Sequence, residues 1–257
     1  MKIIDTHAHY DDAAYAQDRS TILSEINQNG VTHIVNCASS YSSLQTTLEL
    51  TREKAFVYGA LGIHPSDGRD YNDEVEAELR ELLKEDKVVA VGEIGLDYYW
   101  PENPSRDWQK EILLRQFDLA RVAQKPVILH VRDAYGDMID ILRTNHDLSG
   151  ILHAFSGSPE IAKEAVSLGF YLGVGGVSTF KNAKRLPEVI KETPIEFLLT
   201  ETDAPYLTPV PYRGKRNRSD YISYVITAIA GLKGMDPFET ERILYQNAIK
   251  FFGFKAL

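Results

Sequence analysis

The chain has 257 residues, of which 44% are hydrophobic and 25% are charged, as in ordinary soluble globular proteins. Its formal net charge of −9 argues against a protein that coats long nucleic acids, although an enzyme that binds a strand end remains compatible with it. The single cysteine, Cys37, excludes an intramolecular disulfide. Without a signal-like start or a run of about 18 apolar residues, the sequence predicts a cytoplasmic protein that does not span a membrane.

Short apolar runs rich in β-branched residues alternate with longer segments of helical periodicity. The runs predict eight strands, at residues 2–5, 31–37, 56–63, 88–94, 127–131, 151–155, 170–174 and 197–200. Segments with apolar positions three or four residues apart predict helices, for example at 18–29, 73–85, 107–124 and 159–168, and a last helix at 237–252. Eight hydrophobic strands separated by helices predict an α/β fold, a (β/α)8 TIM barrel that forms a single domain over residues 1–257. A doubly wound open sheet is the alternative.

Polar residues gather at the predicted strand ends, where the active site of such a barrel lies. These ends hold five of the seven histidines, namely His7, His9, His64, His130 and His153, and the carboxylates Glu93, Glu201 and Asp203. Residues two apart share one face of a strand, so the pairs His7 and His9, His130 and Arg132, and Glu201 and Asp203 should each point into the mouth of the barrel. His33, inside the second strand, and His146, near a helix end, are predicted to be structural.

This set of side chains favours a metal site. Imidazole and carboxylate ligands without cysteine are typical of Zn²⁺, Mn²⁺ or Mg²⁺ bound for catalysis. Six residues suffice for two divalent ions bridged by a carboxylate, and these are His7, His9, Glu93, His130, His153 and Asp203. Two ions about 4 Å apart can bind both the attacking and the leaving oxygen of a phosphoryl displacement.

The motifs, taken in order, resemble the TatD family of metal-dependent deoxyribonucleases, which belongs to the amidohydrolase-like metal-dependent hydrolases. The similar stretches are DTHAH (5–9), GIHP (62–65), GEIGLDY (92–98), HVR (130–132), HAFSG (153–157), TFKNA (179–183), ETDAPYL (201–207) and RGKRN (213–217). Two positions differ from the family pattern: Ser66 and Asp67 follow His64-Pro65 where a second histidine is frequent, and Ser219 stands where a proline is usual.

The resemblance implies roles for the six residues. One ion would be held by His7, His9, Glu93 and Asp203, and the other by Glu93, His130 and His153. Asp203 would also accept the proton of the attacking water, which makes Asp203 and Glu93 the predicted catalytic residues. Glu201 and Asp97 would support the ligands from behind. The implied substrate is DNA, as single strands or strand ends, with no obligate protein partner.

The predicted contacts with substrate phosphates are His64, Arg132, Arg213, Lys215 and Arg216. Each has an alternative interpretation: His64 as a packed strand end, Arg132 in a structural ion pair, and the basic run after the eighth strand as a solvated loop. Tyr98, Tyr99 and Trp100 would either stack a base or pack beneath a loop. Gly173, Gly175 and Gly176 lack the spacing of a nucleotide-binding loop and are predicted to allow close backbone packing.

The sequence thus predicts a metal-dependent hydrolase, a DNA exonuclease that cleaves phosphodiester bonds with a water activated by two metals. Two alternatives stay open. One is an amidohydrolase-type enzyme that acts on a small ester or amide or on aminoacyl-tRNA, for which the basic run would be of no use. The other is a metal-loaded interaction protein with weak activity, which the intact set of ligands disfavours.

Overall fold

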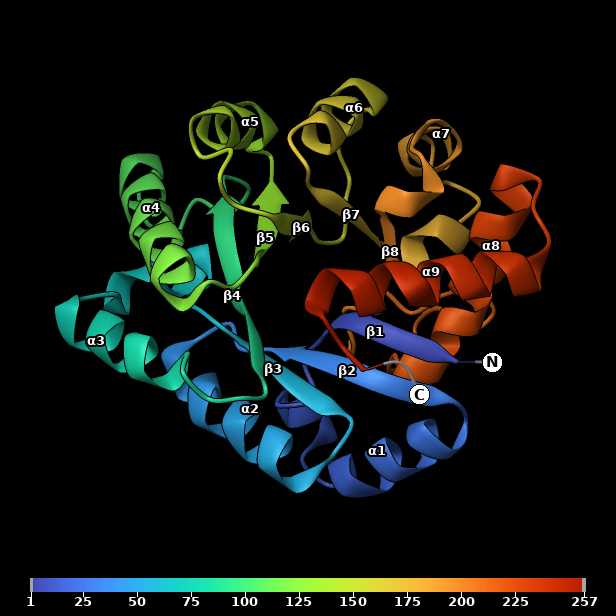
Figure 1. Ribbon diagram of the computed structural model, residues 1–257, viewed down its shortest axis with the longest axis horizontal. Helices are drawn as coiled ribbons and strands as arrows, with labels where there is room; N and C mark the ends of the chain where they lie inside the picture. Colours follow the sequence, from blue (N-terminus) through green and yellow to red (C-terminus); the bar gives the residue numbers. More distant parts are fainter. Residues whose placement is uncertain (1, 256–257) are drawn as a thin grey trace.

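The computed structural model describes residues 2–255, which form an eight-stranded parallel sheet surrounded by helices (Figure 1). The strands are β1 (Ile3–Ala8), β2 (Val31–Cys37), β3 (Val57–Leu61), β4 (Val88–Asp97), β5 (Val127–Arg132), β6 (Gly150–Leu152), β7 (Tyr171–Val174) and β8 (Leu198–Thr200). The α-helices are α1 (Arg19–Gln28), α2 (Tyr41–Glu53), α3 (Asp73–Leu82), α4 (Arg106–Ala123), α5 (Tyr135–Thr144), α6 (Pro159–Ser167), α7 (Arg185–Glu192), α8 (Ile222–Lys233) and α9 (Pro237–Phe252). Each strand pairs with the next one in the sequence, so the predicted (β/α)8 barrel is confirmed and the open sheet is excluded.

The barrel closes between β8 and β1 through a short parallel bridge. Ala8 pairs with Ala204 across the gap. The backbone N–H of Asp203 donates to the carbonyl oxygen of His7 at 2.9 Å, and that of His9 donates to Ala204 at 2.7 Å. The hydrogen bonds that close the barrel therefore hold Asp203 beside the two histidines at the end of β1.

Helix ends follow the capping residues of the sequence. Ser158 accepts a hydrogen bond from the backbone of Ile161 at the start of α6, and Pro159 occupies the first helical position. Asp236 caps α9 in the same way, and Gly253 ends that helix in the left-handed conformation. These local signals explain why the predictions for α6 and α9 match the structure to within one residue.

The predicted end of the fourth strand is wrong. β4 continues past Ile94 to Asp97, because its last residues pair with the end of β5, Asp97 lying opposite Arg132. Gly95 permits this approach, since a Cβ there would overlap the carbonyl oxygen of His130. Glu93 therefore lies within the strand, deeper in the barrel than predicted, and Asp97 occupies the strand end.

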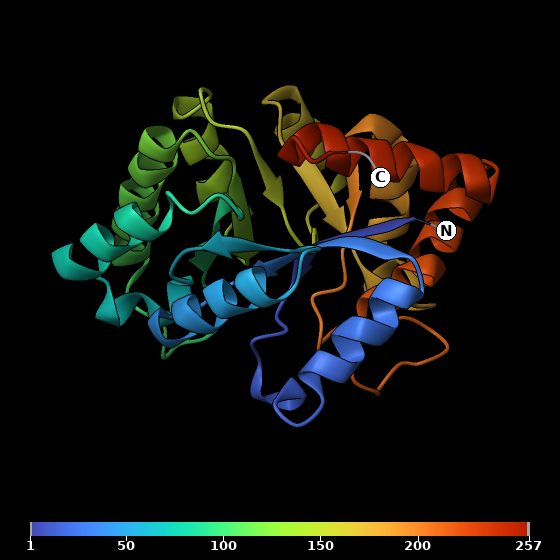
Figure 2. The same ribbon diagram turned by 60° about the horizontal axis from the view of Figure 1, so that its bottom comes forward.

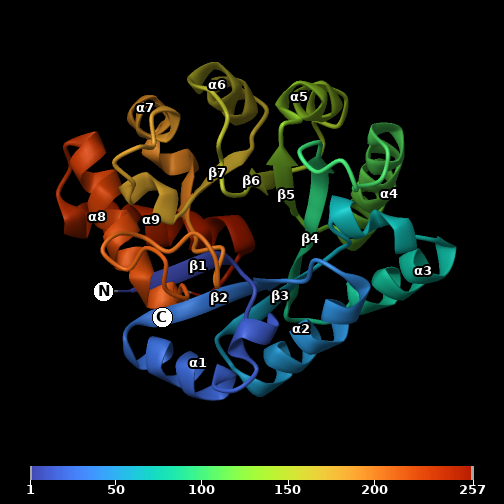
Figure 3. The ribbon, with the colours of Figure 1, turned by 180° about the vertical axis from the view of Figure 1, so that it is seen from behind.

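The two ends of the barrel are covered differently. Helix α9 and Phe254 pack on an inner core with residues such as Ile4, Val35 and Ile128 at the amino ends of the strands. The loops that follow β1 and β8 project on the opposite side (Figure 2), and Figure 3 views the barrel from that side with α9 behind. None of the helices within residues 2–255 has the length and apolarity needed to cross a bilayer.

Candidate metal centre

The first group of side chains surrounds one oxygen of Glu93. The Nε2 atoms of His7 and His9, which are 3.0 Å apart, lie 3.4 and 3.5 Å from Glu93 Oε2. Asp203 Oδ1 completes the group at 3.7 Å from His7 Nε2 and 3.4 Å from His9 Nε2. Strands β1 and β4 and the segment after β8 thus aim four potential ligand atoms at one point.

The second group shares Glu93 through its other oxygen. Glu93 Oε1 is 2.7 Å from His153 Nε2 and 3.0 Å from His130 Nδ1, and these two nitrogens are 3.4 Å apart. His153 comes directly after β6 and His130 lies near the end of β5. The structure therefore brings all six predicted ligands together, with Glu93 between two groups of donors.

The spacing and chemistry of these atoms fit divalent cations. A tetrahedral ion bound about 2.0–2.2 Å from each donor separates the donors by about 3.3–3.6 Å. In the first group the two imidazole nitrogens are 3.0 Å apart and lie 3.4–3.7 Å from the oxygens of Glu93 and Asp203, which is close to that requirement. The second group offers three protein atoms and so leaves positions for water or substrate, as catalytic sites do. Both groups combine imidazole with carboxylate, the ligand set of Zn²⁺ and Mn²⁺ sites.

Neighbouring acceptors orient the histidine rings. His9 Nδ1 is 2.8 Å from the carbonyl oxygen of Cys37, so this nitrogen carries the proton and Nε2 faces the first group. His130 Nε2 is 3.1 Å from Asp97 Oδ2, which leaves Nδ1 for the second group. His153 Nδ1 lies 3.8 Å from Glu201 Oε1, beyond hydrogen-bond distance. Asp97 thus stands behind His130 within hydrogen-bond distance, whereas Glu201 lies near His153 without a hydrogen bond to it.

Neighbouring groups of opposite charge shift each other's pKa values within the site. Burial alone would raise the pKa of Glu93, but the charge of His153 and the hydrogen bond from His130 hold it well below its usual value. Burial would lower the pKa of His9, yet Asp203 and Glu93 raise it to about 9. The ionised carboxylates therefore hold protons on neighbouring imidazoles, and a divalent cation would displace those protons.

Asp5 is a buried carboxylate that sequence reasoning did not single out, although it opens the first motif. It accepts hydrogen bonds from the backbone N–H groups of His7 and Thr202 and from the hydroxyl of Ser219. Burial raises its pKa to about 7, against the opposing effect of the hydrogen bonds from Ser219 and Thr202. Ser219 also donates its backbone N–H to Tyr10 at 2.9 Å, and a proline there could make neither bond. The departure at position 219 therefore ties the loop after β8 to β1.

A cavity of about 580 Å³ opens above the two groups. His64 and Arg132, two of the predicted phosphate contacts, line it. His64 Nε2 lies 3.7 Å from Glu93 Oε1, and burial together with the nearby His130 lowers the pKa of His64 to about 3. Arg132 has no carboxylate partner among residues 2–255, and its guanidinium stacks 3.9 Å above the ring of Tyr99. The alternative of a structural ion pair for Arg132 is therefore wrong.

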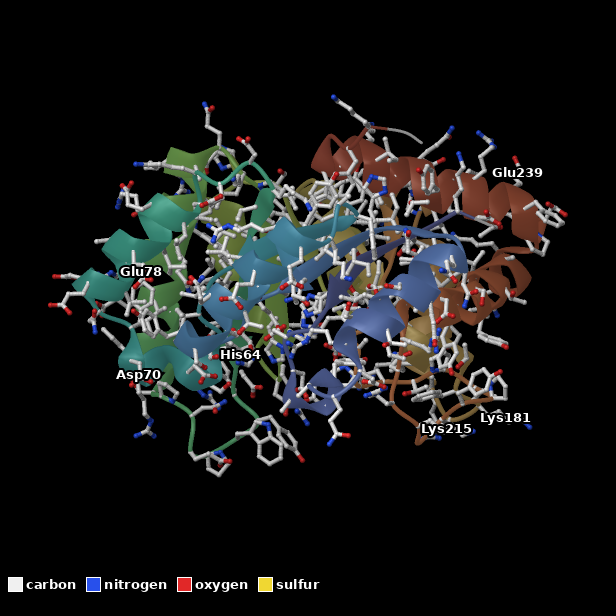
Figure 4. The ribbon with its side chains drawn as sticks, turned by 90° about the horizontal axis from the view of Figure 1, so that it is seen from below. His64, Asp70, Glu78, Lys181, Lys215 and Glu239 are labelled. Carbon is white, nitrogen blue, oxygen red and sulfur yellow. The ribbon has the colours of Figure 1, made fainter. Side chains whose placement is uncertain are left out.

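The cations after β8 have different surroundings, and the prediction that Arg216 contacts a substrate phosphate needs correction. Arg216 pairs with Asp18 at 2.6 Å, because the loop turns this side chain towards the start of α1. None of Arg213, Lys215 and Arg216 lines the cavity. Arg213 lies over the ring of Phe180 at 4.3 Å. Lys215 is exposed, and in the view of Figure 4 it and Lys181 lie at the same edge of the molecule, away from His64.

Sequence reasoning missed three further cations. Lys181, Lys184 and Arg185 are exposed, the two lysines between β7 and α7 and Arg185 as the first residue of α7, and none pairs with a carboxylate within the described chain. The expectation that polar residues after the strand ends lie near the active site could have identified these cations after β7 as well. Tyr98 packs against the barrel through its hydrogen bond to Asp137, whereas Tyr99 and Trp100 are 49% and 45% exposed beside Arg132.

Comparisons with known proteins agree with this geometry. The family model described as TatD related DNase matches residues 4–253. The chain belongs to the TatD family. It is 42% identical to the uncharacterized metal-dependent hydrolase YabD of Bacillus subtilis over 97% of this chain and 98% of that one. It is 36% identical to the uncharacterized metal-dependent hydrolase YcfH of Escherichia coli K12, covering 98% of this chain and 96% of that one. The crystal structure of YJJV, a TatD homologue from E. coli K12, superposes with a TM-score of 0.93 and 32% identity over 98% of both chains.

This TatD-family chain is therefore a metal-dependent hydrolase, and its clusters of histidine and carboxylate side chains can hold metal ions. The match extends over nearly the whole chain, so it includes every strand that contributes to the centre. The family membership predicted from the ordered motifs is confirmed.

Proposed function

We propose that this TatD-family hydrolase cleaves phosphodiester bonds and removes nucleotides from an end of single-stranded DNA. The observation that supports the proposal best is the pair of donor groups joined by Glu93 beneath an open cavity. Two ions held side by side by these groups suit a reaction in which one oxygen attacks phosphorus as another leaves. We therefore propose two divalent ions, Zn²⁺, Mn²⁺ or Mg²⁺, as cofactors.

The roles proposed for the protein residues follow from their positions. Once bound to the six ligands, divalent ions polarise a phosphoryl oxygen and lower the pKa of water. Asp203 lines the cavity with 18% of its side chain exposed. Burial would raise the pKa of Asp203, but the hydrogen bond from His9 and the charges of His153 and His7 keep it low. Its ionised carboxylate is thus available to accept a proton from an attacking water.

A route for the strand adjoins the cavity. Arg132 lies on the cavity wall, where its guanidinium can pair with a phosphate. Tyr99 and Trp100 stand next to it with their rings perpendicular and 4.7 Å apart. Exposed aromatic rings beside a cation suit a single strand, because bases of any sequence can stack on aromatic rings. Arg213 and Lys215, together with Lys181, form a second group of cations on the loops after β8 and β7.

A second candidate is an amidohydrolase-type reaction on a small ester or amide. It is favoured by three carboxylates, Asp11, Asp12 and Asp67, which line the same cavity. Carboxylates repel a polyanion and attract a neutral or cationic substrate, so they oppose entry of a long strand from that side.

One experiment compares the two candidates. Protein loaded with Zn²⁺, Mn²⁺ or Mg²⁺ is incubated with end-labelled single-stranded oligonucleotides and, separately, with a panel of small esters and amides and aminoacyl-tRNA. The nuclease proposal expects a ladder of products that shorten from one end and disappear on chelation. Cleavage of the small esters or amides alone would contradict it.

The salt dependence of binding tests the assignment of the arginines. Each contact with a phosphate of a single strand contributes about 0.7 to the slope of log affinity against log salt. Arg132→Ala should lower that slope by about one contact. Arg216→Ala should leave the slope unchanged, because Arg216 already pairs with Asp18. An effect of Arg216→Ala equal to that of Arg132→Ala would restore the original prediction for Arg216.

A further inference from the structure

A second cavity opens beside the metal centre, and we call it the side pocket. Its volume is about 350 Å³, within the range of about 300–1,000 Å³ that is usual for small-molecule sites. It shares five lining residues with the main cavity, namely Ala154, Ser156, Val177, Asp203 and Leu207. A molecule whose reacting group lies at the metal ligands can therefore extend into the side pocket.

The lining of the side pocket is mostly apolar and has flat portions. Val177, Ala183 and Leu186 contribute aliphatic surface, and Gly173 and Gly175 contribute backbone without side chains. A Cβ at Gly173 would overlap the carboxylate of Glu201, so only glycine leaves room for that group. Backbone faces and short aliphatic groups suit a flat ring better than a branched or charged group.

One polar atom in this lining lacks a partner. Glu201 is fully buried, and its Oε1 accepts a hydrogen bond from the backbone N–H of Ala154 at 2.5 Å. Its Oε2 has no hydrogen-bond donor among residues 2–255. Oε2 has almost no exposed surface and packs against Gly173, so the carboxylate shapes the side pocket but a bound molecule does not reach this oxygen.

The entrance to the side pocket is cationic. Lys184 and Arg185 line it and are exposed, and neither pairs with a carboxylate in the described part of the chain. The ligand that fits this arrangement has a flat, largely apolar ring and is attached to an anionic chain. Those are the properties of a nucleotide.

We propose that the side pocket binds the nucleobase of the nucleotide whose phosphate lies at the metal ligands. The inference rests on the proposed function, because it takes a phosphate as the group at the centre. It makes the enzyme selective for strand ends that present a base.

Binding, measured without turnover, tests this assignment. Zn²⁺-loaded protein is titrated by calorimetry with dAMP and with 2-deoxyribose 5-phosphate, which lacks the base. Because a stacked base typically improves binding strongly, dAMP should bind about tenfold more tightly or better. Ala183→Phe places a ring in the side pocket and should reduce this affinity ratio to near one.

The matched control is Ala123→Phe, at a partly buried position at the end of α4 that lines neither cavity. It should keep the tenfold ratio. If Ala183→Phe unfolds the protein, Val177→Phe fills the same space from another segment and should give the same result. Equal affinity of the wild type for both probes, or a ratio that survives in a folded, filled variant, would overturn the proposal.

The result for the side pocket can be distinguished from the result for the proposed nuclease activity. Shortening of oligonucleotides without any preference for dAMP would refute the base pocket alone. A preference for dAMP that the filled variants lose, in a protein that cleaves no oligonucleotide, would support the pocket and refute the nuclease.

Discussion

Histidines occupy both ends of this barrel, but their surroundings differ. At the amino end, the His33 ring stacks on Phe254 and Tyr58 with centroids 4.7 and 5.6 Å away, and its Nδ1 lies 3.0 Å from the hydroxyl of Thr32. At the mouth, the nitrogens of His7 and His153 lie 3.4 and 2.7 Å from the carboxylate of Glu93.

The difference shows that the neighbours of a histidine, rather than its residue type, determine whether it can bind a metal or only packs in the core. Aromatic neighbours use a histidine as a flat apolar ring, and burial lowers the pKa of His33 so that it stays neutral. A carboxylate between several imidazoles forms a set of donors that a cation can join. Changes at the mouth should therefore affect metal binding and turnover, and changes at the amino end should affect stability alone.

The largest effect is expected for Glu93→Gln. An amide cannot bridge two cations as an anion does, so both ions should be lost and turnover should fall by more than the roughly 10²-fold typical of a residue that only supports a ligand. Elemental analysis and the oligonucleotide assay measure the two losses. Glu111→Gln on the exposed face of α4 is the matched control. Two ions per chain retained in Glu93→Gln would exclude the bridging role.

Asp203→Asn should lower turnover by about 10²–10⁴-fold, the usual contribution of a positioned proton acceptor, and change substrate binding less. Steady-state kinetics measures kcat and KM separately, and metal content is determined in the same samples because Asp203 also belongs to the first group. Near-normal turnover in variant protein that holds its metal would show that Asp203 is not the base. Glu201 cannot take over this role, because it does not line the main cavity.

Asp97→Asn should weaken metal binding by about 10–100-fold, since Asp97 orients His130 from 3.1 Å. Competition with a chelator of known affinity measures this change. Asp86→Asn makes the same substitution on exposed chain just before the amino end of β4 and should leave metal affinity unaltered. If both variants bound metal alike, the contact between Asp97 and His130 would have no part in the site.

The smallest effect is expected for His33→Phe, which keeps the aromatic stack and removes the titrating group. A pKa lowered by burial means that the folded state favours neutral His33. Its contribution to stability is therefore complete above the unfolded pKa of about 6.5 and is lost as the pH falls below that value. The drop in Tm between pH 7.5 and pH 5.5 should be a few degrees smaller in the variant than in the wild type. Loss of metal from this variant would contradict the division between the two ends.

The sequence by itself determined the barrel and the list of metal-centre residues. Alternating strands and helices leave few arrangements for eight hydrophobic strands, and parallel strands place their carboxyl ends at one edge. His7, His9, His130, His153 and Asp203 could therefore be listed from strand-end position alone, because position along a strand is local information.

Only the tertiary structure decided how these residues meet their partners. The pairing of β4 with β5 placed Glu93 inside the strand and left Asp97 behind His130. Packing of the loop after β8 turned Arg216 towards Asp18. Closure of the barrel brought Ser219 to a position where its hydroxyl donates a hydrogen bond to Asp5. The side pocket likewise forms from segments after β6, β7 and β8. Each of these contacts joins residues that are distant in the chain, and their geometry depends on strand register and loop packing, which no local pattern encodes.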